Sequence, residues 1–136
     1  MTYGNTAVAR ARFLDDAVVT ASPARLVVML YDRLLLDLTR GADAQVLGDR
    51  IEANRHLLHA QDIVLELASS LQHGVWEGSA ALASIYGFVH SELVRANVSG
   101  DAARTMGARE LLAPLAEAWR AAALETAAAL PVERAG

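Results

Sequence analysis

The chain has 136 residues, a formal net charge of −4 and no cysteine. This length suits one domain, and the lack of cysteine excludes disulfides and thiolate metal sites. More than half of the residues are apolar but only 5% are aromatic, and Ala and Leu, the strongest helix formers, dominate the apolar set. Acidic and basic residues are interspersed without a basic stripe, which argues against nucleic acid as a partner.

Residues 1–16 show little periodicity and predict a flexible N-terminal arm. They lack the charged start, apolar run and small-residue cleavage site of a signal peptide, so we expect a cytoplasmic location. The longest unbroken apolar run, residues 26–31, is far shorter than the ~20 residues that a membrane-spanning helix needs. We therefore expect no membrane insertion.

The first helix has a clear predicted start, with Ser22 as N-cap and Pro23 at the first helical position. Leucines then recur at helical spacing, at positions 26, 30, 34 and 38. Either Gly41 or Gly48 ends this helix. Gly48 is favoured, because Gly48 followed by Asp49 fits the end of one helix and the cap of the next.

The second helix is expected over residues 49–73, with a wide apolar arc made of two adjacent rows. One row passes through residues 57, 64 and 71, and the other through 51, 58 and 65. Ser79 is the expected N-cap of a third helix that ends at Ser99 and Gly100. Asp101 should cap the fourth helix, which Pro114 should kink.

Four helices joined by short turns predict an all-α fold, an antiparallel up-down-up-down four-helix bundle. The bundle domain is expected over residues 17–130, after the arm of residues 1–16. The last residues, 131–136, are expected to fray.

Four-helix bundles often hold di-metal sites built on Glu-x-x-His pairs, but no Glu here has His three residues later. His56 and His59 are flanked by Glu52 and Asp62, and we interpret all four as a solvated polar face. No nucleophile has an evident base and orienting group. We therefore expect no metal, no cofactor and no enzyme activity, with a bundle metalloenzyme as the rival hypothesis.

The first helix is apolar nearly all round, through residues 26–31 and 34–36. Such a helix is normally buried on several sides, whereas a helix of a four-helix bundle keeps one face toward solvent. Either the arm or a partner protein should cover the spare face, and helix-in-groove binding is one way to use it. Self-association explains the pattern equally well, so a homodimeric helical adaptor stays open as the alternative function.

Several motifs resemble those of the flagellin-specific export chaperone family, FliS. The most specific is Thr-Ala-Ser-Pro at residues 20–23 followed by Met-Leu-Tyr-Asp at residues 29–32. Weaker elements follow in the family's order and spacing: Gly48–Asp49 with Asn54, residues 60–64, Glu66–Leu67, Ser70–Leu71, Leu82, Ile85–Tyr86, Leu93, Ala96–Asn97, Asp101, Leu115 and Ala118–Trp119. Arg25 and Arg33 stand where Glu and Gly are common in the family, and Gly87 stands where Asp is usual.

The resemblance implies a helical bundle that binds the disordered C-terminal segment of newly made flagellin in the cytoplasm. Binding prevents premature polymerisation and aids delivery to a component of the flagellar type III export gate. No cofactor or catalysis is implied. In the family the N-terminal arm lies over part of the flagellin site and moves aside. Here that cover would include Phe13, where the family typically has Tyr, and Leu14.

A disordered segment that folds on binding must offset its ordering entropy with a large apolar contact. We therefore predict a flagellin-binding groove lined by exposed members of the second- and third-helix rows. Asn97 either caps carbonyls at the turn or hydrogen-bonds a partner's backbone. The predicted groove residues are Leu57, Val64, Leu71, Ile85, Val89, Ala96 and Asn97.

Overall fold

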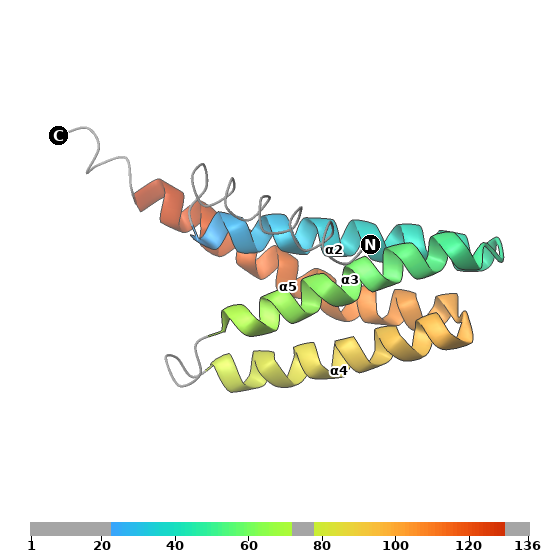
Figure 1. The fold of residues 1–136 in the computed structure, drawn as a ribbon. Coiled ribbons are helices and arrows are strands. Elements are labelled where there is room, and N and C mark those ends of the chain that lie inside the picture. Colours follow the sequence, from blue (N-terminus) through green and yellow to red (C-terminus); the bar gives the residue numbers. More distant parts are fainter. Residues whose placement is uncertain (1–22, 72–77, 130–136) are drawn as a thin grey trace, which may run out of the picture. The chain divides into compact units, whose positions relative to one another are not determined.

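The computed structural model of the chain describes residues 23–71 and 78–129. The predicted arm with Phe13 and Leu14, the predicted N-cap Ser22 and the predicted tail lie outside these residues. The described residues form four α-helices and no strand (Figure 1). The helices are α2 (Pro23–Val46), α3 (Arg50–Ser70), α4 (Gly78–Ser99) and α5 (Ala102–Ala129). The prediction of an all-α four-helix bundle is confirmed.

The chain divides into two compact units. The larger unit, Leu30–Ala116, contains α3, α4, most of α2 and the first half of α5. The smaller unit comprises Met1–Met29 and Glu117–Gly136, of which the structure describes 23–29 and 117–129. The candidate site lies in the larger unit.

The connection between α2 and α3 follows the local chemistry of its residues. Pro23 is the first residue of α2, and the helix runs past Gly41 to Val46. Gly48 then adopts a positive φ of 75°, its N–H donates to the Gln45 carbonyl, and the Asp49 N–H donates to the Ala44 carbonyl. These two bonds form the Schellman motif that ends many helices. The Asp49 carboxylate in turn accepts the Glu52 N–H at 3.1 Å and caps α3.

The connection between α4 and α5 uses the same chemistry. Gly100 has a φ of 70°, and the Asp101 N–H donates to the Ala96 carbonyl at 3.1 Å. The Asp101 carboxylate accepts the Arg104 N–H at 3.2 Å, so the predicted cap is present. The predicted N-cap Ser79 is wrong, because α4 already begins at Gly78 and Ser79 is buried inside the helix. Residues on both sides of Pro114 are helical.

The core of the larger unit is aliphatic, with two buried tyrosines. Leu34 and Leu38 of α2 are fully buried, as the leucine spacing predicted. Helices α2 and α3 approach each other closely at Gly41, where an added Cβ would lie 3.0 Å from Leu57 Cδ2. Gly41 is therefore not a helix terminator but the residue that lets α2 pack tightly on α3.

Candidate functional site

A hydrogen-bond network holds together the end of the larger unit where the two turns lie. The Gln45 amide donates to the Ala96 carbonyl at 2.9 Å, and the Gln45 Oε1 accepts the hydroxyl of Thr105 at 2.7 Å. Thr105 is fully buried, so its hydroxyl requires such a partner. One side chain of α2 thereby joins α4 and α5. These contacts hold α2, α4 and α5 together at this end of the bundle.

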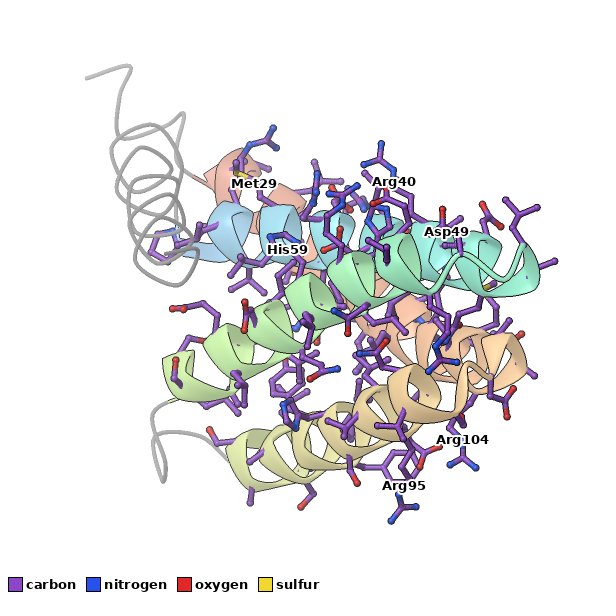
Figure 2. The ribbon with its side chains drawn as sticks, turned by 45° about the vertical axis from the view of Figure 1, so that its right-hand side comes forward. Met29, Arg40, Asp49, His59, Arg95 and Arg104 are labelled. Atoms are coloured by element: carbon purple, nitrogen blue, oxygen red, sulfur yellow. The ribbon has the colours of Figure 1, made fainter. Side chains whose placement is uncertain are left out.

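A buried carboxylate joins α2 to α3. Asp37 has no exposed surface. Its Oδ2 contacts His59 Nδ1 of α3, and its Oδ1 lies 3.2 Å from Arg33 Nε. His59 is labelled in Figure 2. Buried carboxylates need such partners because desolvation disfavours an isolated charge.

The prediction of a solvated face is wrong for His56, whereas the His59 side chain is 41% exposed. His56 is buried, and His59 is engaged with Asp37. Burial lowers the pKa of His56, and the neighbouring Arg55 guanidinium lowers it further. Both imidazoles lie on the α2-facing side of α3, where the buried carboxylate favours polar neighbours. Within the described residues, no group of three or more metal-binding side chains occurs.

Tyr31 of α2 and Tyr86 of α4 form a buried pair, with hydroxyl oxygens 2.7 Å apart and ring centroids at 6.4 Å. Burial raises the pKa of Tyr86, while the hydrogen bond with Tyr31 acts in the opposite direction. Both tyrosines are therefore part of the core.

Four of the seven predicted groove residues are core residues, so their predicted exposure is wrong. Leu57, Val64, Val89 and Ala96 have no exposed surface. The α3 row through residues 57 and 64 packs inside the bundle, where α3 and α4 meet over many residues. These side chains cannot touch a partner without opening the core.

The other three predicted residues are partly exposed and do not share one face. Leu71 is the C-cap of α3. Ile85 precedes Glu92 by seven residues, and Glu92 pairs with Arg104 of α5 at 3.1 Å, so Ile85 lies on the α5 side of α4. Asn97 donates to Asn54 Oδ1 of α3 at 2.8 Å, a side-chain contact that was not among the two roles expected for it.

The Asn54–Asn97 contact marks a face where α3 and α4 meet at the surface. The two helices lie side by side in Figure 1. Leu58 and Leu65, which are 46% and 51% exposed, follow Asn54 at helical spacing. The exposed residue Val94 precedes Asn97 at the same spacing on α4. We define the α3–α4 face as Asn54, Leu58, Gln61, Leu65, Gly87, His90, Val94 and Asn97.

The α3–α4 face combines exposed aliphatic groups, side-chain amides and one imidazole, and none of its residues is Asp, Glu or Arg. A Cβ added at Gly87 would meet no atom within 4 Å, so the face has open space there. Leu58 and Leu65 belong to the second apolar row recognised in the sequence, which is the exposed one. The signal that identifies it is the Asn54–Asn97 contact, which sequence spacing alone does not provide.

A pocket of about 430 Å³ opens beside this face at the two turns. Its lining is mixed, with side-chain amides, the Arg50 guanidinium and the Asp49 carboxylate beside Ile51. The lining residues are Gln45, Gly48, Asp49, Arg50, Ile51, Ala53, Asn54, Asn97, Ser99 and Gly100.

Comparison with known proteins identifies the family of this chain. Residues 5–126 match the family model described as "Flagellar protein FliS". The chain belongs to the FliS family. Two curated relatives agree, both described as "Flagellar secretion chaperone FliS". The protein of Bacillus subtilis is 29% identical over 110 residues, which cover 81% of this chain and 82% of that protein.

The relative from Salmonella typhimurium is also 29% identical over 110 residues, covering 79% of this chain and 81% of that protein. Membership of the FliS family, a family of flagellar secretion chaperones, points away from an enzyme. Among the described helices, none has the length and hydropathy needed to span a membrane.

Proposed function

We propose that this FliS family member binds the C-terminal segment of flagellin in the cytoplasm, prevents its premature polymerisation and aids its delivery to the flagellar type III export apparatus. The α3–α4 face supports this proposal more than any other observation. It offers exposed aliphatic groups to an amphipathic segment and contains no Asp, Glu or Arg that a partner would have to desolvate.

The chemistry of the face suits a segment that orders only when it binds. Leu58, Leu65 and Val94 supply the apolar contact that offsets the ordering entropy. The amides of Asn54 and Asn97 bond each other at 2.8 Å, and each amide has further donor and acceptor capacity. A peptide backbone that lies along the face would meet hydrogen-bonding groups at this end.

The decisive experiment is co-expression with flagellin from the same cell, either full-length or without its C-terminal segment. We expect full-length flagellin to co-purify and the truncated form to be lost. Equal recovery of both forms, or of neither, would contradict the proposal. If the chain purifies as a homodimer and flagellin does not join it, the result would favour the homodimeric adaptor as the alternative function.

The location of the site is tested with surface variants of the purified chain. The double variant Leu58→Ser and Leu65→Ser should weaken flagellin binding by roughly tenfold or more, because side chains central to an interface dominate its affinity. The matched control is Leu111→Ser on α5, which is also exposed and should bind as the unchanged chain does. Normal binding by the folded double variant would place the site elsewhere.

A further inference from the structure

The contact between Asn54 and Asn97 sets the register of α3 against α4 along the α3–α4 face. The two helices run in opposite directions (Figure 1), since this contact and the bond from Arg50 to the Val98 carbonyl both join the start of α3 to the end of α4. Each step forward from Asn54 is therefore matched by a step back from Asn97. The pairs of residues that lie level with each other in this register are Leu58 with Val94, Gln61 with His90, and Leu65 with Gly87.

We call these pairs the Leu–Val, Gln–His and Leu–Gly levels. Neighbouring levels are three or four residues apart on both helices, which is about 5 Å along a helix axis. A third helix that lies along the face repeats its side chains at the same interval. An extended segment repeats them every two residues, about 6.6 Å, so it falls about 3 Å out of step over the three levels. The face therefore fits a helical segment.

The Gln–His level is a polar level between two apolar ones. Gln61 and His90 are partly buried, and neither side chain has a hydrogen-bond partner among the residues that the structure describes. The Asn54 and Asn97 amides, by contrast, bond each other at 2.8 Å. Away from its ends a helix satisfies its own backbone groups, so only a side chain of a bound helix can partner Gln61 and His90. An apolar side chain there would bury the amide and the imidazole without a partner, which disfavours binding.

The Leu–Gly level has room for a large side chain. A Cβ added at Gly87 would meet no atom within 4 Å, and Leu65 across from it is 51% exposed. Gly87 is not among the described glycines with positive φ, so its backbone conformation does not require glycine. A bound helix can therefore place a large apolar side chain over Gly87 and against Leu65. At the Leu–Val level, Val94 occupies the corresponding space on α4.

We propose that Gln61 and His90 fix the register of the flagellin segment on the α3–α4 face by hydrogen-bonding one polar side chain of that segment. Three or four residues away on either side, the segment places apolar side chains against the Leu–Val and Leu–Gly levels, the larger one over Gly87. A polar residue among apolar contacts sets the register of coiled-coil helices in the same way, at a cost in stability. The inference rests on the proposed flagellin binding and adds the residues that select the segment's position.

The test changes both polar side chains to leucine in the full chain, as Gln61→Leu with His90→Leu. The affinity for the purified C-terminal segment of flagellin is measured by calorimetry. We expect binding to weaken by about tenfold or more, because the polar side chain of the segment would be buried without a partner. An apolar face without a polar contact predicts the opposite sign, since two more leucines enlarge the apolar contact. Unchanged or tighter binding by the folded variant would overturn the proposal.

A compensating change in flagellin identifies the side chain that is bound. Each polar residue of the segment is replaced by Leu in turn and measured against both forms of the chaperone. One replacement should weaken binding to the unchanged chain and restore binding to the Gln61→Leu, His90→Leu variant, which a double-mutant cycle reports as coupling. The absence of any such residue would rule out a polar side chain of the segment as the partner.

Three further variants control for bulk and folding. His90→Gln keeps a donor and an acceptor and should bind within about twofold of the unchanged chain. Ser91→Leu changes the next residue of α4, which is exposed outside the face, and should leave binding unchanged. If the leucine variants aggregate, Gln61→Ala with His90→Ala removes the same groups without adding apolar surface. It should also weaken binding, and normal binding by it would overturn the proposal.

The space at the Leu–Gly level is tested by Gly87→Leu, which should weaken binding by about tenfold or more because the new side chain fills the space meant for the segment. The matched control is Gly107→Leu on α5, where an added Cβ also meets no atom within 4 Å. It should bind as the unchanged chain does. Equal affinities of the two glycine variants would refute the placement of a large side chain over Gly87.

The Leu58→Ser, Leu65→Ser variant separates this inference from the proposed function. If that variant loses binding while Gln61→Leu with His90→Leu binds more tightly, the flagellin site stands and the register inference fails. If the folded serine variant binds flagellin normally, the site lies elsewhere and both fail.

Discussion

Neighbouring leucines of α3 should differ sharply in what they contribute to stability. Leu57 has no exposed surface, whereas Leu58 is 46% exposed. Replacing a fully buried Leu with Ala removes about 2.4 kcal/mol of transfer free energy at ~0.8 kcal/mol per carbon group. A residual cavity raises the usual cost to about 3–5 kcal/mol. Because Leu57 lies against Gly41, that space cannot close easily.

For Leu58→Ala only about half of the transfer free energy is lost, and water fills the space, so we expect a cost of about 1 kcal/mol. Urea unfolding followed by circular dichroism measures both variants. The free energy of unfolding falls by about 1–3 kcal/mol per molar urea. The urea concentration at the unfolding midpoint should therefore be roughly 1 M or more lower for Leu57→Ala than for Leu58→Ala. Equal midpoints, or a larger loss for Leu58→Ala, would refute the assignment of the buried and exposed rows.

Three further predictions concern the same unit. The pKa of His56 lies below its ordinary value of 6.5 in the folded chain, so the unfolded chain binds more protons. The free energy of unfolding should therefore fall as pH drops through 6.5 toward the folded pKa. Urea unfolding across this pH range should show a smaller fall for the His56→Gln variant. Gly107→Ala should raise the free energy of unfolding by about 0.5–1 kcal/mol, because Gly107 is helical and an added Cβ meets nothing within 4 Å. A thermal unfolding midpoint below that of the unchanged chain would contradict this prediction. Asp49→Ala should lower the free energy of unfolding by about 0.5–2 kcal/mol, whereas Asp49→Asn should lower it little, because only Ala removes the cap on α3. Equal thermal midpoints of the two variants would show that the cap contributes nothing to stability.

The helix boundaries at the two Gly-Asp turns could be predicted from sequence because local chemistry determines them. Gly48 and Gly100 both adopt positive φ, a conformation that glycine reaches without a steric penalty. Asp49 and Asp101 follow them as caps. Each signal lies within a few residues of the boundary it predicts, so no distant contact was needed to read it.

The choice of exposed row could not be predicted from sequence. Residues 57 and 58, or 64 and 65, are neighbours that point about 100° apart on the helix, and both rows are aliphatic. Periodicity identifies both rows as apolar but does not rank them. The rotation of α3 is fixed by distant partners, such as Asn97 for Asn54 and Asp37 for His59, and one sequence does not reveal those pairings.

The histidines show the same limit. His56 and His59 follow the pattern of a solvated stripe, yet the partner of His59 is a carboxylate 22 residues earlier in the chain. Asp37 itself falls within the strongly apolar first helix, where sequence reasoning assigned it no role. A buried polar contact between two helices requires both side chains to be recognised together.

The position of Gln45 bears on how the chain folds. Its two side-chain bonds reach residues 51 and 60 positions later, so they form only after the chain between them has been brought together, and non-local contacts of this kind slow folding. Helices α2 to α5 can each form their local bonds earlier. Replacement of Gln45 should therefore accelerate unfolding more than it slows folding, and the end of the bundle with both turns would be the last part to close.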